Sequence, residues 1–229
     1  MRVSTAVSPI SNRLAERPAV ILLVVLYAAT WLWSAWSPHY RFDWGLENML
    51  PTVMALVLVF GFRRLPLSDV SCLLLFVFLV LHQVGAHYTY SEVPFGWWIG
   101  RLFGSERNHF DRLVHFSFGF LLFYPMREIF IRFVTPSSLL AGICALALNT
   151  AGSAIFEIFE MVTAKVVNPE AGAAYLGTQG DIWDAQMDMT MALAGSVAAF
   201  ALTELAVRTG HLDTLFVPRQ QNFKPPAYK

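Results

Sequence analysis

The stretch VSCLLLFVFLVLHQVGAHY, residues 70–88, decides the fold of this chain. It contains no Asp, Glu, Lys or Arg. A helix needs about 20 apolar residues, at about 1.5 Å each, to cross the hydrocarbon core of a bilayer. The stretch is therefore predicted to be a transmembrane helix, and it carries two imidazoles, His82 and His87, toward its end.

Other apolar segments of comparable length predict, with the first, an all-α bundle of six transmembrane helices. They cover approximately residues 18–36, 46–62, 110–133, 137–163 and 183–207. The segment 46–62 is the weakest, because Glu47 and Pro51 lie in its first turns. We assign residues 1–209 to one membrane domain and residues 210–229 to a polar cytoplasmic tail.

Composition excludes a soluble globular protein. Apolar residues make up 56% of the 229 residues and charged residues 14%, whereas soluble domains carry about 25% charged residues. The chain has no internal repeat or low-complexity tract that would divide it into domains. Its basic residues are scattered at the predicted cytoplasmic rim, where membrane topology accounts for them, so nucleic-acid binding is not expected.

The distribution of Lys and Arg predicts the orientation in the membrane. Cytoplasmic loops of membrane proteins carry an excess of these residues. Most of them here belong to the two termini and to the connections after the second and fourth helices, which lie on one side. The other side holds Arg41, Arg101, Arg107, Arg112 and Lys165. We therefore expect both termini in the cytoplasm.

Acidic and imidazole side chains gather at the outer end of the predicted helices. Ionisable groups are costly in hydrocarbon and are rarely left there without a partner or a task. This pattern indicates where function should be sought. The residues concerned are His82, His87, Asp111, His115, Glu157, Glu160, Asp181, Asp184 and Asp188.

Glu157 and Glu160 carry the strongest signal. A carboxylate near a helix C-terminus opposes the helix dipole at a cost of about 0.3–1 kcal/mol, and an acid at the centre of a membrane helix costs about 2.5 kcal/mol more. Asn149 and Ser153 precede them at spacings of four and extend a polar stripe toward the midplane. Solvation of a helix end does not require such a stripe.

Carboxylates with one or two imidazoles suit Zn, Mn, Fe or Mg, and helical bundles build metal sites from acids on facing helices. Only Arg112 is expected nearby as a fixed cation, which favours a bound metal ion. We predict a metal-dependent hydrolase that acts on a lipid or lipid-linked substrate from the outer leaflet. The predicted ligands are Asp111, His115, Glu157, Asp184 and Asp188; the proton-transfer partner is Glu160 or His82; the supporting residues are Asp181, Asn149, Ser153 and His87.

Three stretches resemble the YjdF-type bacterial inner-membrane proteins, a family of unknown function. They are NHFDRLVHF at residues 108–116, EIFE at 157–160 and LGTQGDIWDAQMDM at 176–189. A shorter likeness links the chain to VanZ-like membrane proteins, which are associated with glycopeptide-antibiotic resistance. The first resemblance implies a location in the bacterial inner membrane, and neither implies an established reaction.

Two other functions remain open from the sequence. An ion- or proton-coupled transporter would use the same acids as a relay, and the stripe from Asn149 to Glu160 favours it. A structural protein would use the polar groups as a buried network that sets helix register.

Overall fold

The computed structural model describes residues 16–61, 67–135, 137–167 and 169–209, and over these residues the chain is all-helical. The predicted all-α fold is confirmed, whereas the tail predicted at 210–229 lies outside the described residues. The longer helices are α1 (Pro18–Ala35), α3 (Met49–Gly61), α4 (Asp69–Tyr88), α6 (Phe110–Phe133), α7 (Ser138–Val166) and α9 (Asp184–Arg208). The shorter ones are α2 (Arg41–Glu47), η2 (Tyr90–Glu92), α5 (Pro94–Leu102) and α8 (Pro169–Leu176).

Four of the described helices, α1, α4, α7 and α9, are long and apolar enough to cross a membrane. Helix α6 has 24 residues but carries charged side chains near both ends. Helix α3 has 13 described residues. The membrane class is thus supported by four spans, and the count of six stays a prediction.

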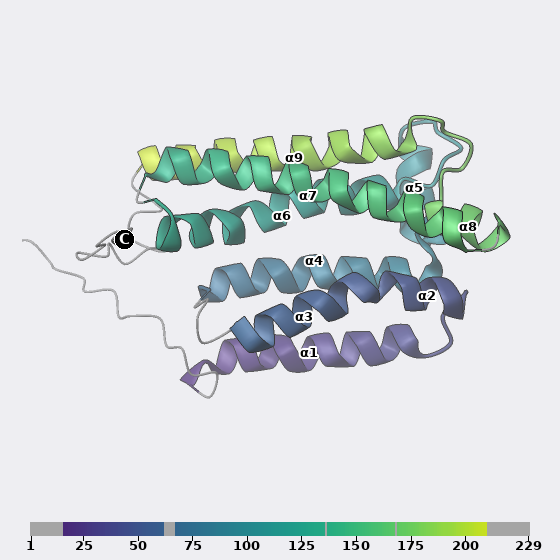
Figure 1. Cartoon of the computed structure of the whole chain (residues 1–229), viewed down its shortest axis with the longest axis horizontal. Helices are drawn as coiled ribbons and strands as arrows, with labels where there is room; N and C mark the ends of the chain where they lie inside the picture. The colour runs from purple at the N-terminus through teal and green to yellow at the C-terminus, as the bar shows by residue number, and fades with distance from the viewer. Residues whose placement is uncertain (1–15, 62–66, 136, 168, 210–229) are drawn as a thin grey trace, which may run out of the picture.

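The long helices run along one axis in two groups (Figure 1). One group contains α1, α3 and α4; the other contains α6, α7 and α9. Helix α4 packs against α6 and joins the groups, while α6, α7 and α9 all contact one another. The short helices α2, α5 and α8 lie together at the right-hand end of the view, the end where α6 and α9 begin.

The helix predicted over 46–62 is wrong at its start. Helix α2 ends at Glu47, and α3 begins at Met49, with Asn48 between them. Asn48 Nδ2 donates to the Trp44 carbonyl over 2.7 Å. Its Oδ1 accepts from Trp31 Nε1 at 2.8 Å and from Gln83 Nε2 at 3.0 Å. Pro51 then falls in the first turn of α3, where a helix does not use backbone N–H groups.

Helices α6 and α9 cross with their backbones in contact. A Cβ added at Gly119 would lie 1.9 Å from the Ala192 carbonyl oxygen, and one at Gly195 would lie 2.1 Å from the Phe116 carbonyl oxygen. Ser196 Oγ also donates to the Gly119 carbonyl at 3.2 Å. Small residues that allow such close approach are a common means of packing membrane helices.

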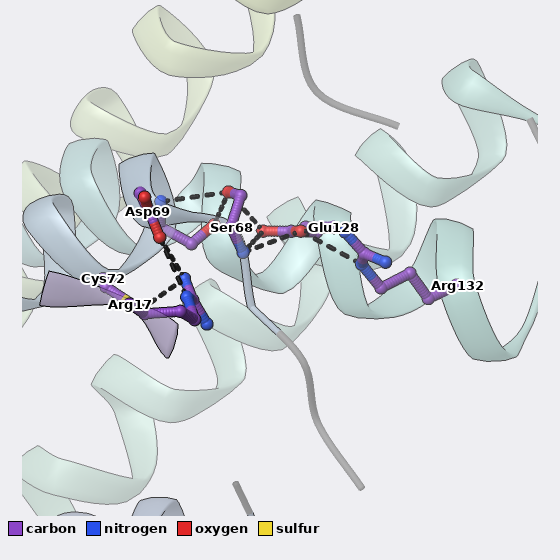
Figure 2. A network of polar contacts seen from close by, with 7 residues as sticks. Arg17, Ser68, Asp69, Cys72, Glu128 and Arg132 are labelled. Carbon is purple, nitrogen blue, oxygen red and sulfur yellow. Dashed lines mark hydrogen bonds and ion pairs between the residues drawn. The ribbon is translucent and has the colours of Figure 1, made fainter. Parts of the chain in front are cut away.

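A buried carboxylate joins α4 to α6 at the opposite end of the bundle (Figure 2). Glu128 is buried and accepts from the Ser68 backbone N–H at 3.0 Å and from the Ser68 hydroxyl at 2.8 Å. Ser71 donates its hydroxyl to Glu128 as well, and Arg132 neutralises the charge at 2.5 Å. The start of α4 is therefore fixed against the last turns of α6.

We predict that Gly195→Ala destabilises the fold. The new methyl group would meet the α6 backbone, which cannot rotate away, and overpacking of this kind costs about 1–3 kcal/mol. The Tm of the detergent-purified protein should fall. Gly152→Ala is the matched control, because its Cβ would meet only the Phe118 ring at 3.4 Å. Equal Tm values for the two variants would contradict the close crossing.

Candidate functional site

Three of the predicted ligands meet near one point. Asp111 and His115 lie in the first two turns of α6, and Asp188 lies in the second turn of α9. One ligand atom from each lies within 4.8 Å of the others. His115 Nε2 is 3.6 Å from Asp111 Oδ1, as the spacing of four on a helix allows.

Two carboxyl groups of α7 adjoin these three residues. Glu157 Oε1 lies 3.4 Å from His115 Nε2. Glu160 follows Glu157 by three residues in α7, so the two side chains lie on the same face of this helix. Three helices thus contribute to one group, which we call the inner cluster: Asp111, His115, Glu157, Glu160 and Asp188.

His115, Glu157 and Asp188 of the inner cluster are buried, whereas Asp111 and Glu160 are half-buried. Asp188 is only 2% exposed. Among the described residues, its Oδ1 and the Oε1 of Glu157 have no hydrogen-bond partner, and no Arg or Lys forms an ion pair with the cluster. Buried carboxylates of this kind are unfavourable unless a cation or a proton accompanies them.

Asp184 does not join the inner cluster. Its carboxylate forms an ion pair with Arg107, which also donates to the Thr178 carbonyl at 2.5 Å. The expectation that Arg112 is the only fixed cation nearby is therefore wrong. Arg107 precedes α6 by a few residues, and only the fold brings it to the start of α9.

Asp181 fixes the entry to α9. It forms an ion pair with Arg112 at 2.5 Å and accepts from the Trp183 backbone N–H at 2.9 Å. The Trp183 amide, with the Arg112 guanidinium, holds the pKa of Asp181 below its usual range. Asp181 thus stays ionised at neutral pH, and its contacts hold the start of α9 against α6.

The segment from Gly177 to Gly180, which precedes Asp181 and which we call the covering segment, is held against the start of α6. Gln179 Oε1 accepts from the Asn108 backbone N–H at 2.9 Å, and its Nε2 donates to the Asn108 carbonyl at 3.0 Å. Gly177 and Gly180 adopt φ of 58° and 84°, which glycine tolerates without strain. This segment therefore covers the same end of the bundle as the inner cluster.

His82 lies in a second polar group. Its Nε2 lies 2.8 Å from the Glu47 carbonyl oxygen, to which it donates, and the Tyr90 hydroxyl lies 2.5 Å from its Nδ1. Burial raises the pKa of Tyr90 well above its usual range, so the hydroxyl keeps its proton and donates. Both ring nitrogens are thus engaged. Of the two predicted proton-transfer partners, only Glu160 joins the inner cluster.

His87 is a packing residue at the α1–α4 interface. Its Nδ1 lies 3.1 Å from the Ser34 carbonyl oxygen. Its ring stacks on Trp33 with centroids 4.4 Å apart and an interplanar angle of 28°. The structure places it away from the inner cluster.

The polar stripe of α7 divides into two parts. Asn149 Nδ2 donates to the Gly119 carbonyl at 3.2 Å and to Ser196 Oγ at 3.3 Å, so it ties α7 to the α6–α9 crossing. Ser153 is buried, and its hydroxyl has no partner among the described residues. Asn149 thus holds helices together, whereas the Ser153 hydroxyl is left to bond to a ligand.

A cavity of about 460 Å³ lies beside the inner cluster, with walls from α3, α4, α6 and α7. Most of its lining is apolar. Its volume lies within the range of about 300–1,000 Å³ that is usual for small-molecule sites. The polar residues of the lining are His82, Tyr90, Asp111, His115, Ser153 and Glu160.

Sequence reasoning missed three residues of this region. Glu47 is buried near His82, and the rule that acids in apolar segments matter could have identified it. Arg107 and Tyr90 carry no such signal, because each lies in a connection whose path depends on the fold.

The family model described as "Predicted membrane protein (DUF2238)" matches residues 19–209. The chain belongs to this family. It is also 34% identical over 169 residues to the inner membrane protein YjdF of Escherichia coli (strain K12). The aligned region covers 72% of this chain and 79% of that protein. No solved structure matches the chain. The predicted resemblance and the inner-membrane location are thus confirmed, while the likeness to VanZ-like proteins stays a prediction.

We predict that Arg107→Gln loosens the covering segment. The substitution leaves the buried Asp184 carboxylate without its cation, and breaking a buried ion pair costs about 3–5 kcal/mol. Hydrogen exchange at residues 177–184 should accelerate and the Tm should fall. The exposed Arg101, changed to Gln, serves as the control. Unchanged exchange in Arg107→Gln would show that the pair does not hold this segment.

Proposed function

We propose that the inner cluster binds a divalent metal ion and that the protein is a metal-dependent hydrolase of a lipid or lipid-linked substrate. One observation carries this proposal: Asp188 Oδ1 and Glu157 Oε1 are buried beside His115 without hydrogen-bond partners among the described residues. A buried anionic oxygen without a partner favours a cation.

Asp111, His115 and Asp188 are the proposed ligands, with Glu157 as a fourth. Their close spacing and their chemistry, oxygen donors with one imidazole, suit Zn, Mn, Fe or Mg. Asp184, also predicted as a ligand, takes a different role in this proposal: its pair with Arg107 positions the start of α9.

Glu160 is the proposed acid–base residue, because it lines the cavity and lies on the same face of α7 as Glu157. A bound divalent ion would lower the pKa of a water molecule and polarise an ester or phosphoester. The water oxygen bonds to the carbon or phosphorus, and the bond to the leaving oxygen breaks. Glu160 takes the proton from the water and gives it to the leaving oxygen.

The proposal includes six spans, both termini in the cytoplasm and the inner cluster at the outer face. The distribution of charge supports it. The basic side chains Arg17, Arg127, Arg132 and Arg208 lie at the end opposite the inner cluster, which is the cytoplasmic end by the positive-inside rule.

The transporter alternative has less support. Its relay would continue from Glu157 through Ser153 to Asn149, but the Asn149 amide is bound to the Gly119 carbonyl and to Ser196. The structural alternative also has less support, because a self-sufficient network would supply hydrogen-bond partners for Asp188 Oδ1 and Glu157 Oε1.

We predict that protein purified without chelator contains one divalent metal ion per chain. Asp188→Asn and His115→Gln should lose it, because each removes a ligand, whereas Asp184→Asn should keep it. Elemental analysis and calorimetric titration measure the content and the affinity. Metal at about 100 times its Kd should stabilise the native protein by about 2.7 kcal/mol, seen as a higher Tm.

Absence of metal after purification, together with no binding on titration with Zn, Mn, Fe and Mg, would exclude the metal site. Loss of metal from Asp184→Asn in a folded protein would return Asp184 to the ligand set.

Glu160→Gln should slow hydrolysis by about 10²- to 10⁴-fold, the usual effect of removing a general acid–base group, while the metal content stays unchanged. The measurement uses nitrophenyl fatty-acyl esters and bis(nitrophenyl) phosphate in mixed micelles. Glu92→Gln, an acid outside the inner cluster, is the control. A Glu160→Gln enzyme with the wild-type rate would rule out this role for Glu160.

A further inference from the structure

The cavity beside the inner cluster is strongly asymmetric. Asp111, His115 and Glu160 contribute polar groups, while Phe78, Phe118 and Ile155 are among the residues that form the apolar part. A cavity that joins carboxylates to an apolar space matches an amphiphile, with its polar group at the acids and its chain against the aromatic side chains.

The cavity reaches the surface of the bundle between α3 and α7. Val53 of α3 and Ile155 of α7 both line it, yet they are 57% and 66% exposed. Leu50 and Phe159, from the same two helices, are also lining residues with exposed side chains. In a membrane protein such an apolar rim faces lipid chains, so an amphiphile can enter from the side without leaving the bilayer.

Ser153 is a polar group placed within the apolar part. Thr52, Thr150 and Thr190 satisfy their hydroxyls by donating to the carbonyl four residues earlier in the helix, at 2.7–2.9 Å. Ser153, one turn deeper than Glu157, has no such bond, although it is only 2% exposed. A buried hydroxyl without a partner is unfavourable, so a ligand oxygen that accepts a hydrogen bond from it would be favoured at this position.

We propose that the cavity binds a fatty-acyl lipid that enters between α3 and α7. The acyl chain lies against Phe78 and Phe118, the acyl carbonyl accepts a hydrogen bond from the Ser153 hydroxyl, and the head group lies at the inner cluster. A carbonyl beside an apolar chain is what distinguishes an acyl lipid from an isoprenyl lipid. The inference that the cavity binds an acyl chain depends only on the cavity. The inference that this lipid is the hydrolysed substrate rests on the proposed function.

The first experiment identifies the residues that lie next to the bound acyl chain. Wild-type protein in nanodiscs is irradiated with a monoacylglycerol that carries a diazirine in its chain, and labelled peptides are identified by mass spectrometry. We expect labelling of the α3, α4 and α6 residues that line the cavity. Gly152→Leu should reduce it about tenfold, because a Cβ there meets only the Phe118 ring and a longer side chain enters the cavity. Ala151→Leu, on the lipid-exposed side of α7, should not.

The second experiment tests the hydrogen bond from Ser153 and does not use a variant that blocks the cavity. The wild type should bind an acyl ester about two- to tenfold more tightly than the matching alkyl ether, the factor expected for one hydrogen bond. Ser153→Ala should remove this difference by weakening the ester alone. Equal affinities in the wild type, stronger labelling by an isoprenyl probe, or unchanged labelling in Gly152→Leu would each overturn the proposal.

The same measurements with a chelator and with Asp188→Asn separate the two proposals. Cavity labelling that persists in protein without metal supports lipid binding even if the hydrolase proposal fails. A metal-loaded, active enzyme whose cavity is not labelled overturns the acyl-lipid proposal and leaves the hydrolase proposal standing.

Discussion

The contact between the backbones of α6 and α9 is the constraint on which the site depends. With Gly119 and Gly195 at the crossing, the two helices are in direct contact and start at the same end of the bundle. Asp111 lies two turns before Gly119, and Asp188 lies two turns before Gly195, so a rise of about 1.5 Å per residue brings both carboxylates to one level. A larger residue at either glycine would separate them. The packing of small residues is therefore also the device that assembles the inner cluster.

The acids at this end of the bundle divide by their partners. Asp181 and Asp184, at the entry to α9, have Arg112 and Arg107, and these pairs fix the covering segment. Asp188, one turn further in, has neither arginine as a partner. Ion pairs with arginine thus do not extend from the entry of α9 to Asp188. A fold that needed these acids only for stability would extend its arginines inward, because a buried carboxylate without a cation is the costlier case.

Much of the fold follows from the sequence, because transmembrane length and apolar composition are local properties. The predicted segments at 110–133, 137–163 and 183–207 agree closely with α6, α7 and α9. The spacing of four placed Asp111 and His115 on one face for the same reason. The pairing of Arg107 with Asp184 and the break at Asn48 depend on contacts between distant segments, which no local pattern reports. Asn149 and Ser153 looked equivalent in the stripe, and only their neighbours distinguish a tie between helices from a spare hydroxyl.

The two polar groups that line the cavity differ in how completely their hydrogen bonds are made. His82 has both ring nitrogens engaged, one by the Glu47 carbonyl and one by Tyr90, so its ring has no nitrogen left for a ligand. The wall formed by α7 carries Ser153, which has no partner among the described residues, and Glu160 of the inner cluster. A ligand in the cavity therefore gains little from new hydrogen bonds to His82 and gains most from those to α7. Hydrogen bonding and chemistry are then concentrated on the α7 side of the cavity, while α4 contributes the apolar surface of Phe78.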